Sequence, residues 1–183
     1  MKKLLLSLAT AVCMSACAQK GEQKQEDGGK KVLVAYFSAT GTTADAANKV
    51  AAVTGGDVYE IVPEKPYTAQ DLDWTDKQSR CFVEMHDLSS RPAIKATKDD
   101  IDIYDTVYIG FPIWWNIAPT IVNTFIEAHN LKGKTVIPFA TSGGSTIDNS
   151  EKELRNAYPD INWKNGKLLN GIGEDEIRQW TNI

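Results

Sequence analysis

The sequence has little histidine, with two residues of this type among 183. A serine or cysteine hydrolase needs a base beside its nucleophile, and only His86 and His129 are available for that role. The sequence also has no Gly-x-Ser-x-Gly motif and no metal-ligand spacing of His and Cys. These absences disfavour a hydrolase and predict that the protein has no metal site.

Cysteine is equally scarce, with three residues. Cys13 and Cys17 lie in the N-terminal segment, so Cys81 has no intramolecular partner once processing has used the other two. We therefore expect no disulfide, and we interpret Cys81 as a buried apolar residue rather than a redox thiol. The fold must then depend on packing for its stability.

Positive charge is not in excess either. The chain has 20 Lys and Arg against 24 Asp and Glu, and loss of Lys2 and Lys3 with a cleaved leader takes the net charge from −4 to −6. Nucleic-acid-binding domains are typically basic. The charge balance therefore predicts that nucleic acid is not a partner.

The apolar run LLLSLATAVCM at residues 4–14 is too short to cross a bilayer, which takes about 20 residues. It follows Lys2 and Lys3, and this pattern is typical of a signal peptide. The run leads into MSAC, which resembles a bacterial lipobox, with Met14 where Leu is usual. We therefore expect residues 1–16 to be removed and Cys17 to be lipidated, with an ordinary cleaved signal peptide as the alternative. Residues 17–30 would then be the anchor and a flexible polar linker, tethering an exported domain to the cell envelope.

Strand-like and helix-like patterns alternate through residues 31–183 and predict one α/β domain with a doubly wound parallel sheet. In such sheets ligands bind beyond the carboxyl ends of the strands. A possible capping box at residues 68–71 predicts a helix that runs toward His86. Strands are expected at 31–37, 57–62, 105–111, 134–140 and near 161–169, and further helices at 42–53, 119–130, 148–158 and 173–183.

The loop SATGTT at residues 38–43 follows the first strand and opens a helix. Amides at a helix N-terminus form an anion site, to which the hydroxyls add further donors. The loop has no Lys or Arg, which excludes a Walker motif and predicts a phosphate held by neutral groups. A hydroxyl-rich helix cap without a ligand is the alternative.

Two further loops follow the third and fourth expected strands. In FPIWWNIAP, at residues 111–119, Trp114 and Trp115 cannot both face the core, so one flat indole is expected at the ligand end of the sheet. In TSGGST, at residues 141–146, two glycines and four hydroxyls permit close polar contacts. Taken singly, each loop also fits an ordinary connection; taken together they predict a mononucleotide site.

These three segments resemble the flavodoxin family, and the resemblance covers residues 31–183. It implies a flavodoxin-like five-stranded parallel sheet of order 2-1-3-4-5, with FMN as the cofactor. It also makes Pro138 acceptable within the fourth strand. It assigns the phosphate to Ser38, Ala39, Thr40, Gly41, Thr42 and Thr43, and the ring to Pro112, Ile113, Trp114, Trp115, Asn116, Ser142, Gly143, Gly144 and Ser145. The resemblance further implies that Asn116 lies beside the flavin, where a residue that tolerates positive φ is needed.

The resemblance implies redox work, either as an electron carrier or as an FMN-dependent oxidoreductase. Its partner would be a redox protein or a small-molecule acceptor. An NAD(P)H-dependent flavin or quinone reductase is one alternative, although no nicotinamide site is recognisable. A non-redox lipoprotein that keeps the fold without FMN is another.

The lipobox reading predicts that Cys17→Ser abolishes lipid attachment, because serine has no thiol to carry the lipid. Metabolic labelling with a fatty-acid analogue, followed by fractionation, checks this. Cys13→Ser is the matched control and is expected to label like the parent. Equal labelling of Cys17→Ser and the parent would contradict the assignment.

Overall fold

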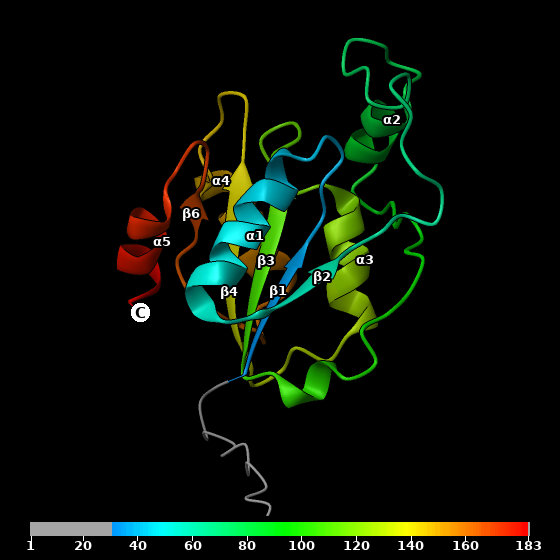
Figure 1. Ribbon diagram of the computed structural model, residues 1–183. Coiled ribbons are helices and arrows are strands. Elements are labelled where there is room, and N and C mark those ends of the chain that lie inside the picture. The colour runs from blue at the N-terminus through cyan, green and yellow to red at the C-terminus, as the bar shows by residue number, and fades with distance from the viewer. Residues whose placement is uncertain (1–30, 183) are drawn as a thin grey trace, which may run out of the picture.

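Parallel strands form the centre of the domain in this computed structural model, which describes residues 31–182 (Figure 1). The strand order is β2-β1-β3-β4-β5, and the short β6 also pairs with β4. The predicted order 2-1-3-4-5 is therefore confirmed, with the fifth position shared by two short strands. The strands are β1 (Val32–Tyr36), β2 (Asp57–Glu60), β3 (Thr106–Pro112), β4 (Thr135–Thr141), β5 (Asn162–Trp163) and β6 (Lys167–Leu168).

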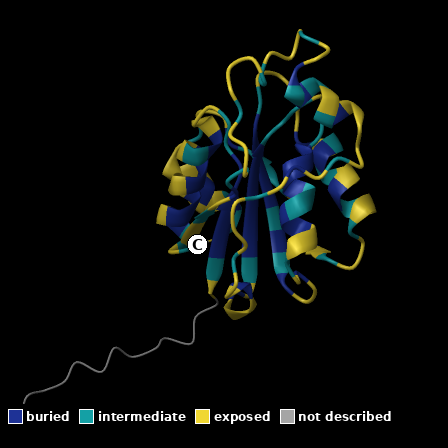
Figure 2. Ribbon diagram, turned by 90° about the vertical axis from the view of Figure 1, so that its right-hand side faces the viewer, coloured by how far each residue is buried: buried dark blue, intermediate teal, exposed yellow. Residues whose placement is uncertain are grey.

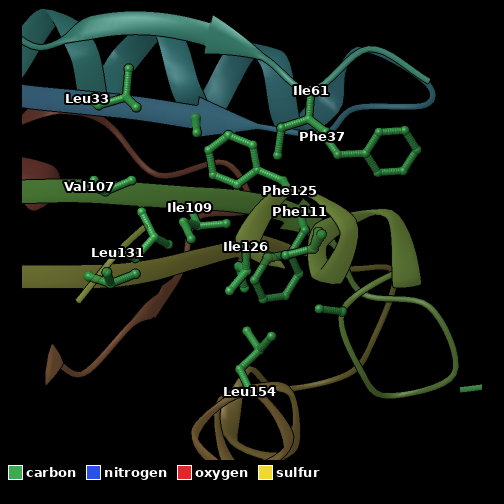
Figure 3. Packing of buried hydrophobic residues seen from close by; sticks show 14 of the residues in the cluster. Leu33, Phe37, Ile61, Val107, Ile109, Phe111, Phe125, Ile126, Leu131 and Leu154 are labelled. Atoms are coloured by element: carbon green, nitrogen blue, oxygen red, sulfur yellow. The ribbon is translucent and has the colours of Figure 1, made fainter. Parts of the chain in front are cut away.

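Helices cover both faces of this sheet (Figure 2). Because successive residues of a strand point to opposite faces, β1 contributes to two separate cores. Leu33 packs in one cluster with Phe125 and Leu154 (Figure 3), whereas Val34 packs in the other with Val50 and Ile177. The helices are α1 (Thr42–Thr54), α2 (Arg80–His86), α3 (Thr120–Ala128), α4 (Asp148–Ala157) and α5 (Glu174–Thr181), with a 3-10 turn at Ile101–Ile103.

Pro138 explains why the fifth position of the sheet is divided. The carbonyls of Val136 and Ala140 accept hydrogen bonds from Lys164 and Leu169, so this side of β4 faces β5 and β6. Residue 138 lies between them and faces the same side, where proline has no amide to donate. The gap between β5 and β6 falls at this point, and a side chain at Gly166 would collide with the Pro138 carbonyl.

The helix predicted from residues 68–71 toward His86 is wrong over most of its length. Thr68 and Asp71 do exchange the hydrogen bonds of a capping box, with Asp71 N to Thr68 Oγ1 at 3.1 Å and Thr68 N to Asp71 Oδ2 at 2.9 Å. The chain nevertheless continues in turns, and the helix begins only at Arg80, where the Ser79 hydroxyl accepts from the Phe82 amide. Residues 71–79 have no apolar stripe to bury, so the local cap did not propagate.

No helix within residues 31–182 is long and apolar enough to span a membrane. The expectations for residues 1–30, including lipid attachment at Cys17, lie outside the described residues. Cys81 is buried, as expected for an apolar residue.

Gly110 of β3 gives a test of the side-chain packing between neighbouring strands of the sheet. It pairs with Phe139 of β4, and a Cβ at Gly110 would collide with the Phe139 ring. Overpacking typically costs 1–3 kcal/mol, so Gly110→Ala should lower the free energy of unfolding by about that amount. Urea denaturation measures the change, with Gly143→Ala as the control because its Cβ would meet nothing within 4 Å. Equal stability of the two variants would contradict this packing.

Candidate functional site

The loop after β1 presents backbone amides at the start of α1. Gly41 is the N-cap of α1 and has φ 92°, a conformation that favours glycine. Its amide donates to Ser38 Oγ at 3.1 Å, which folds the loop back on itself. The amides of the first helical turn have no partner within the helix. They are the groups that can hold an anion here, together with the exposed hydroxyls of Thr40 and Thr42.

Thr43 has a different position from its neighbours. Its side chain is buried and its hydroxyl lies 2.8 Å from the hydroxyl of Thr141, the last residue of β4. This hydrogen bond joins the loop after β1 to the end of β4, where the loop at residues 141–146 begins. The Thr43 side chain therefore fixes the geometry of the site, and its amide remains available to an anion.

The loop after β3 makes a tight turn with strained backbone. Trp114 and Ile117 exchange both backbone hydrogen bonds, each at 3.0 Å. The two residues between them, Trp115 and Asn116, have φ values of 45° and 69°, the pattern of a type I′ turn. The expectation that Asn116 takes positive φ is confirmed. Positive φ at Trp115 was not foreseen, and it is a costly conformation for a bulky residue.

Contacts from two helices hold this strained turn. The Asn116 carbonyl accepts from Asn149 Nδ2 at 3.2 Å and from Ser150 Oγ at 3.4 Å, both in α4. The Trp115 ring packs edge-on against Phe82 and His86 of α2, with centroid distances of 5.6 Å. The surrounding structure thus compensates for backbone strain at the turn.

Trp114 is half-buried and points back toward the first strand. Its ring meets Phe37 and Tyr67 edge-on, at centroid distances of 5.6 and 5.5 Å. Tyr67 in turn donates to Glu84, which pairs with Arg80, and the Arg80 guanidinium lies 3.9 Å from the Tyr67 ring centroid. Burial, then the hydrogen bond and charge of Glu84, raise the pKa of Tyr67. Tyr67 therefore stays protonated and holds Trp114 in place.

The loop after β4 is organised by Ser142. Its hydroxyl accepts from the amides of Gly144 and Ser145, at 3.1 and 2.7 Å. Its backbone pairs with the Asn170 side chain, which accepts from the Ser142 amide at 2.8 Å and donates to the Ser142 carbonyl at 2.6 Å. Sequence reasoning missed Asn170, because nothing local shows that a residue 28 positions away closes this loop.

The three loops enclose a cleft of about 360 Å³, which we call the loop cleft. It brings together seven of the residues predicted for the site, adds two that were not predicted, and has no Lys or Arg among its lining residues. Of the other predicted residues, Ala39 and Trp115 line an adjoining cavity instead. The loop cleft is lined by Thr40, Thr42, Pro112, Ile113, Trp114, Ser142 and Gly143, as predicted, and by Thr141 and Asn170.

Nothing in the described part of the chain resembles a metal centre, since no three potential ligands among residues 31–182 cluster together. An anion-binding helix N-terminus, a flat indole and a glycine-rich loop instead meet at the carboxyl ends of β1, β3 and β4. This arrangement defines the class of doubly wound α/β domains that bind a nucleotide-like phosphate at the strand ends.

Sequence comparison identifies the family. The flavodoxin family model matches residues 31–183, and the chain belongs to this family. No curated protein matches the sequence.

Solved structures agree with this assignment. A Bacteroides eggerthii protein with a provisional flavoprotein designation is 61% identical, with a TM-score of 0.83, over 84% of this chain and 97% of its own. A Bacteroides uniformis protein with the same designation is 60% identical, with a TM-score of 0.82, over 85% and 99%. A Lactobacillus acidophilus flavoprotein solved in complex with FMN shares the fold at 21% identity, with a TM-score of 0.67, over 84% and 99%.

The strained turn makes a prediction about Asn116. Valine is costly at positive φ, so Asn116→Val should lower the free energy of unfolding by about 1–3 kcal/mol, whereas Asn116→Gly should leave it unchanged or raise it. Urea denaturation without added flavin measures both. Asn48→Val, on the exposed face of α1, is the matched control and should stay within about 0.5 kcal/mol of the parent. Equal losses for the two valine variants would mean that the turn is not strained.

Proposed function

We propose that this domain binds FMN in the loop cleft and works as a redox flavoprotein. The observation that carries the proposal is the meeting of three loops with complementary chemistry at one edge of the sheet. Unpartnered amides and hydroxyls after β1 suit a phosphate, and Trp114 after β3 offers a flat surface for an aromatic ring. The third loop approaches from β4 with two glycines, whose lack of side chains lets a ligand come close to the backbone.

The residues fit FMN in charge as well as in shape. A volume of about 360 Å³ lies within the range of small-molecule sites. A phosphate bound by amides and hydroxyls keeps its negative charge, because no cationic side chain lines the cleft. FMN would supply the electron-transfer chemistry, and the chain would bind it, orient its ring and limit the access of water.

We further propose that Cys17 tethers the domain to a membrane. In Figure 1, β1 begins at the end of the sheet opposite the loops that form the cleft. An anchor that enters through β1 would therefore leave the loop cleft open to a redox partner or a small-molecule acceptor.

The proposal predicts that Thr40→Val weakens FMN binding, because it removes one hydroxyl donor and keeps the shape of the side chain. A hydrogen bond to a charged group is worth about 1.5–3 kcal/mol, so the dissociation constant for FMN should rise roughly 10- to 150-fold. Quenching of flavin fluorescence measures it. Thr97→Val, an exposed threonine outside the cleft lining, is the control and should bind like the parent.

Riboflavin separates the phosphate from the ring in the same assay. It should bind the parent much more weakly than FMN does and should be indifferent to Thr40→Val. Equal affinity of the parent for both flavins would refute the phosphate role. Failure to bind either flavin would favour a protein that keeps the fold without the cofactor.

A further inference from the structure

A second cavity adjoins the loop cleft on the side of the segment between β2 and β3. It has a volume of about 470 Å³, and we call it the aromatic pocket. Four residues line both spaces, namely Thr40, Pro112, Ile113 and Trp114. A molecule in the aromatic pocket would therefore lie beside whatever occupies the loop cleft.

The far wall of the aromatic pocket comes from the segment between β2 and β3. Leu72, Trp74 and Cys81 line it, and Trp74 is 71% exposed at its rim. In Figure 1 this segment and α2 stand beyond the carboxyl ends of the strands. The Cys81 amide donates to the Asp71 carbonyl at 2.9 Å, which ties the turn to α2 and gives the pocket a fixed wall.

The side chains that line the aromatic pocket are mostly apolar, and several of them are planar rings. Three tryptophans line it, and no charged side chain does. The nearby guanidinium of Arg80 is already occupied by Glu84 and by the Lys65 carbonyl. The charged pyrophosphate of a nicotinamide dinucleotide would lose its water against apolar side chains here, whereas an uncharged planar ring would find aromatic surfaces on which to stack.

We infer that the aromatic pocket binds an uncharged, planar electron acceptor of the quinone class. The inference rests on the proposed binding of FMN in the adjoining cleft. Two electrons and two protons leave the reduced flavin, and the two carbonyl groups of the quinone become hydroxyl groups. The flavin returns to its oxidised form, and the products balance without another reactant. The β2–β3 segment would thus make this domain a quinone-reducing enzyme rather than a carrier alone.

Tetramethyl-1,4-benzoquinone is a suitable probe, because it has no free ring carbon to which the Cys81 thiol could add. The FMN-loaded protein is photoreduced without oxygen and mixed with the probe in a stopped-flow instrument, and flavin absorbance gives the rate. The parent should show saturation with quinone concentration. Trp74→Ala should raise the half-saturating concentration about 3- to 10-fold, and Trp74→Phe should restore part of the loss.

Two controls make the result specific. Leu88→Ala removes another exposed apolar side chain of the same segment, which does not line the aromatic pocket, and should behave like the parent. Ferricyanide, a charged acceptor that needs no apolar pocket, should oxidise all four proteins at similar rates. Equal slowing with both acceptors, or no effect of Trp74→Ala on the quinone, would overturn the inference.

Binding is measured separately, by equilibrium dialysis of the probe against FMN-free protein and by titration with FMN. Trp74→Ala should weaken binding of the probe and leave FMN affinity within about twofold. A loss of FMN affinity would overturn the inference, because the aromatic pocket would then hold the flavin ring itself. If the parent binds the probe but not FMN, the proposed function fails and the pocket stands.

Discussion

Parallel pairing of β1, β3 and β4 is the constraint on which the candidate site depends. Tyr36 pairs with Gly110, and Pro112 pairs with Thr141, so the three strands end side by side and their loops begin at neighbouring points. The buried hydrogen bond between Thr43 and Thr141 then joins the first loop to the end of β4. Loops that are far apart in the sequence thereby acquire fixed relative positions, as a site for one small cofactor requires.

The turn at Trp115 and Asn116 depends on these fixed positions of the surrounding elements. Left-handed backbone at two consecutive non-glycine residues is unfavourable, and it persists only where surrounding contacts determine it. Here α4 binds the Asn116 carbonyl and α2 packs against the Trp115 ring. The strain lies where the resemblance to flavodoxins places the edge of the flavin ring. The helices on both sides therefore stabilise a conformation that the sequence alone would not favour.

The strands and the loops were predictable because their signals are local, whereas the strand order followed from the resemblance to flavodoxins. Apolar runs such as that at residues 31–37, and the hydroxyl-rich and tryptophan-rich loops, can be read within a few residues. The segment at 63–99 was not predictable for the opposite reason. Tyr67 packs on Trp114, and the Arg80 guanidinium binds the Lys65 carbonyl. These partners are too far apart in the sequence for a local motif to show that they meet. Asn170 and Thr141 were missed in the same way, since each is identified only by a distant partner.

The two cavities have in common that neither is lined by a charged side chain. Arg80 is paired with Glu84, and Lys49 donates to the Ile172 carbonyl, so neither points a free cation into the space above the strands. A phosphate held there by amides and hydroxyls would keep its charge and oppose the addition of further negative charge to a ring beside it. A reduced ring in such a field gives up electrons readily, and an acceptor that enters without charge meets no electrostatic barrier. A neutral planar molecule in the aromatic pocket therefore suits the field of the loop cleft better than an anionic one.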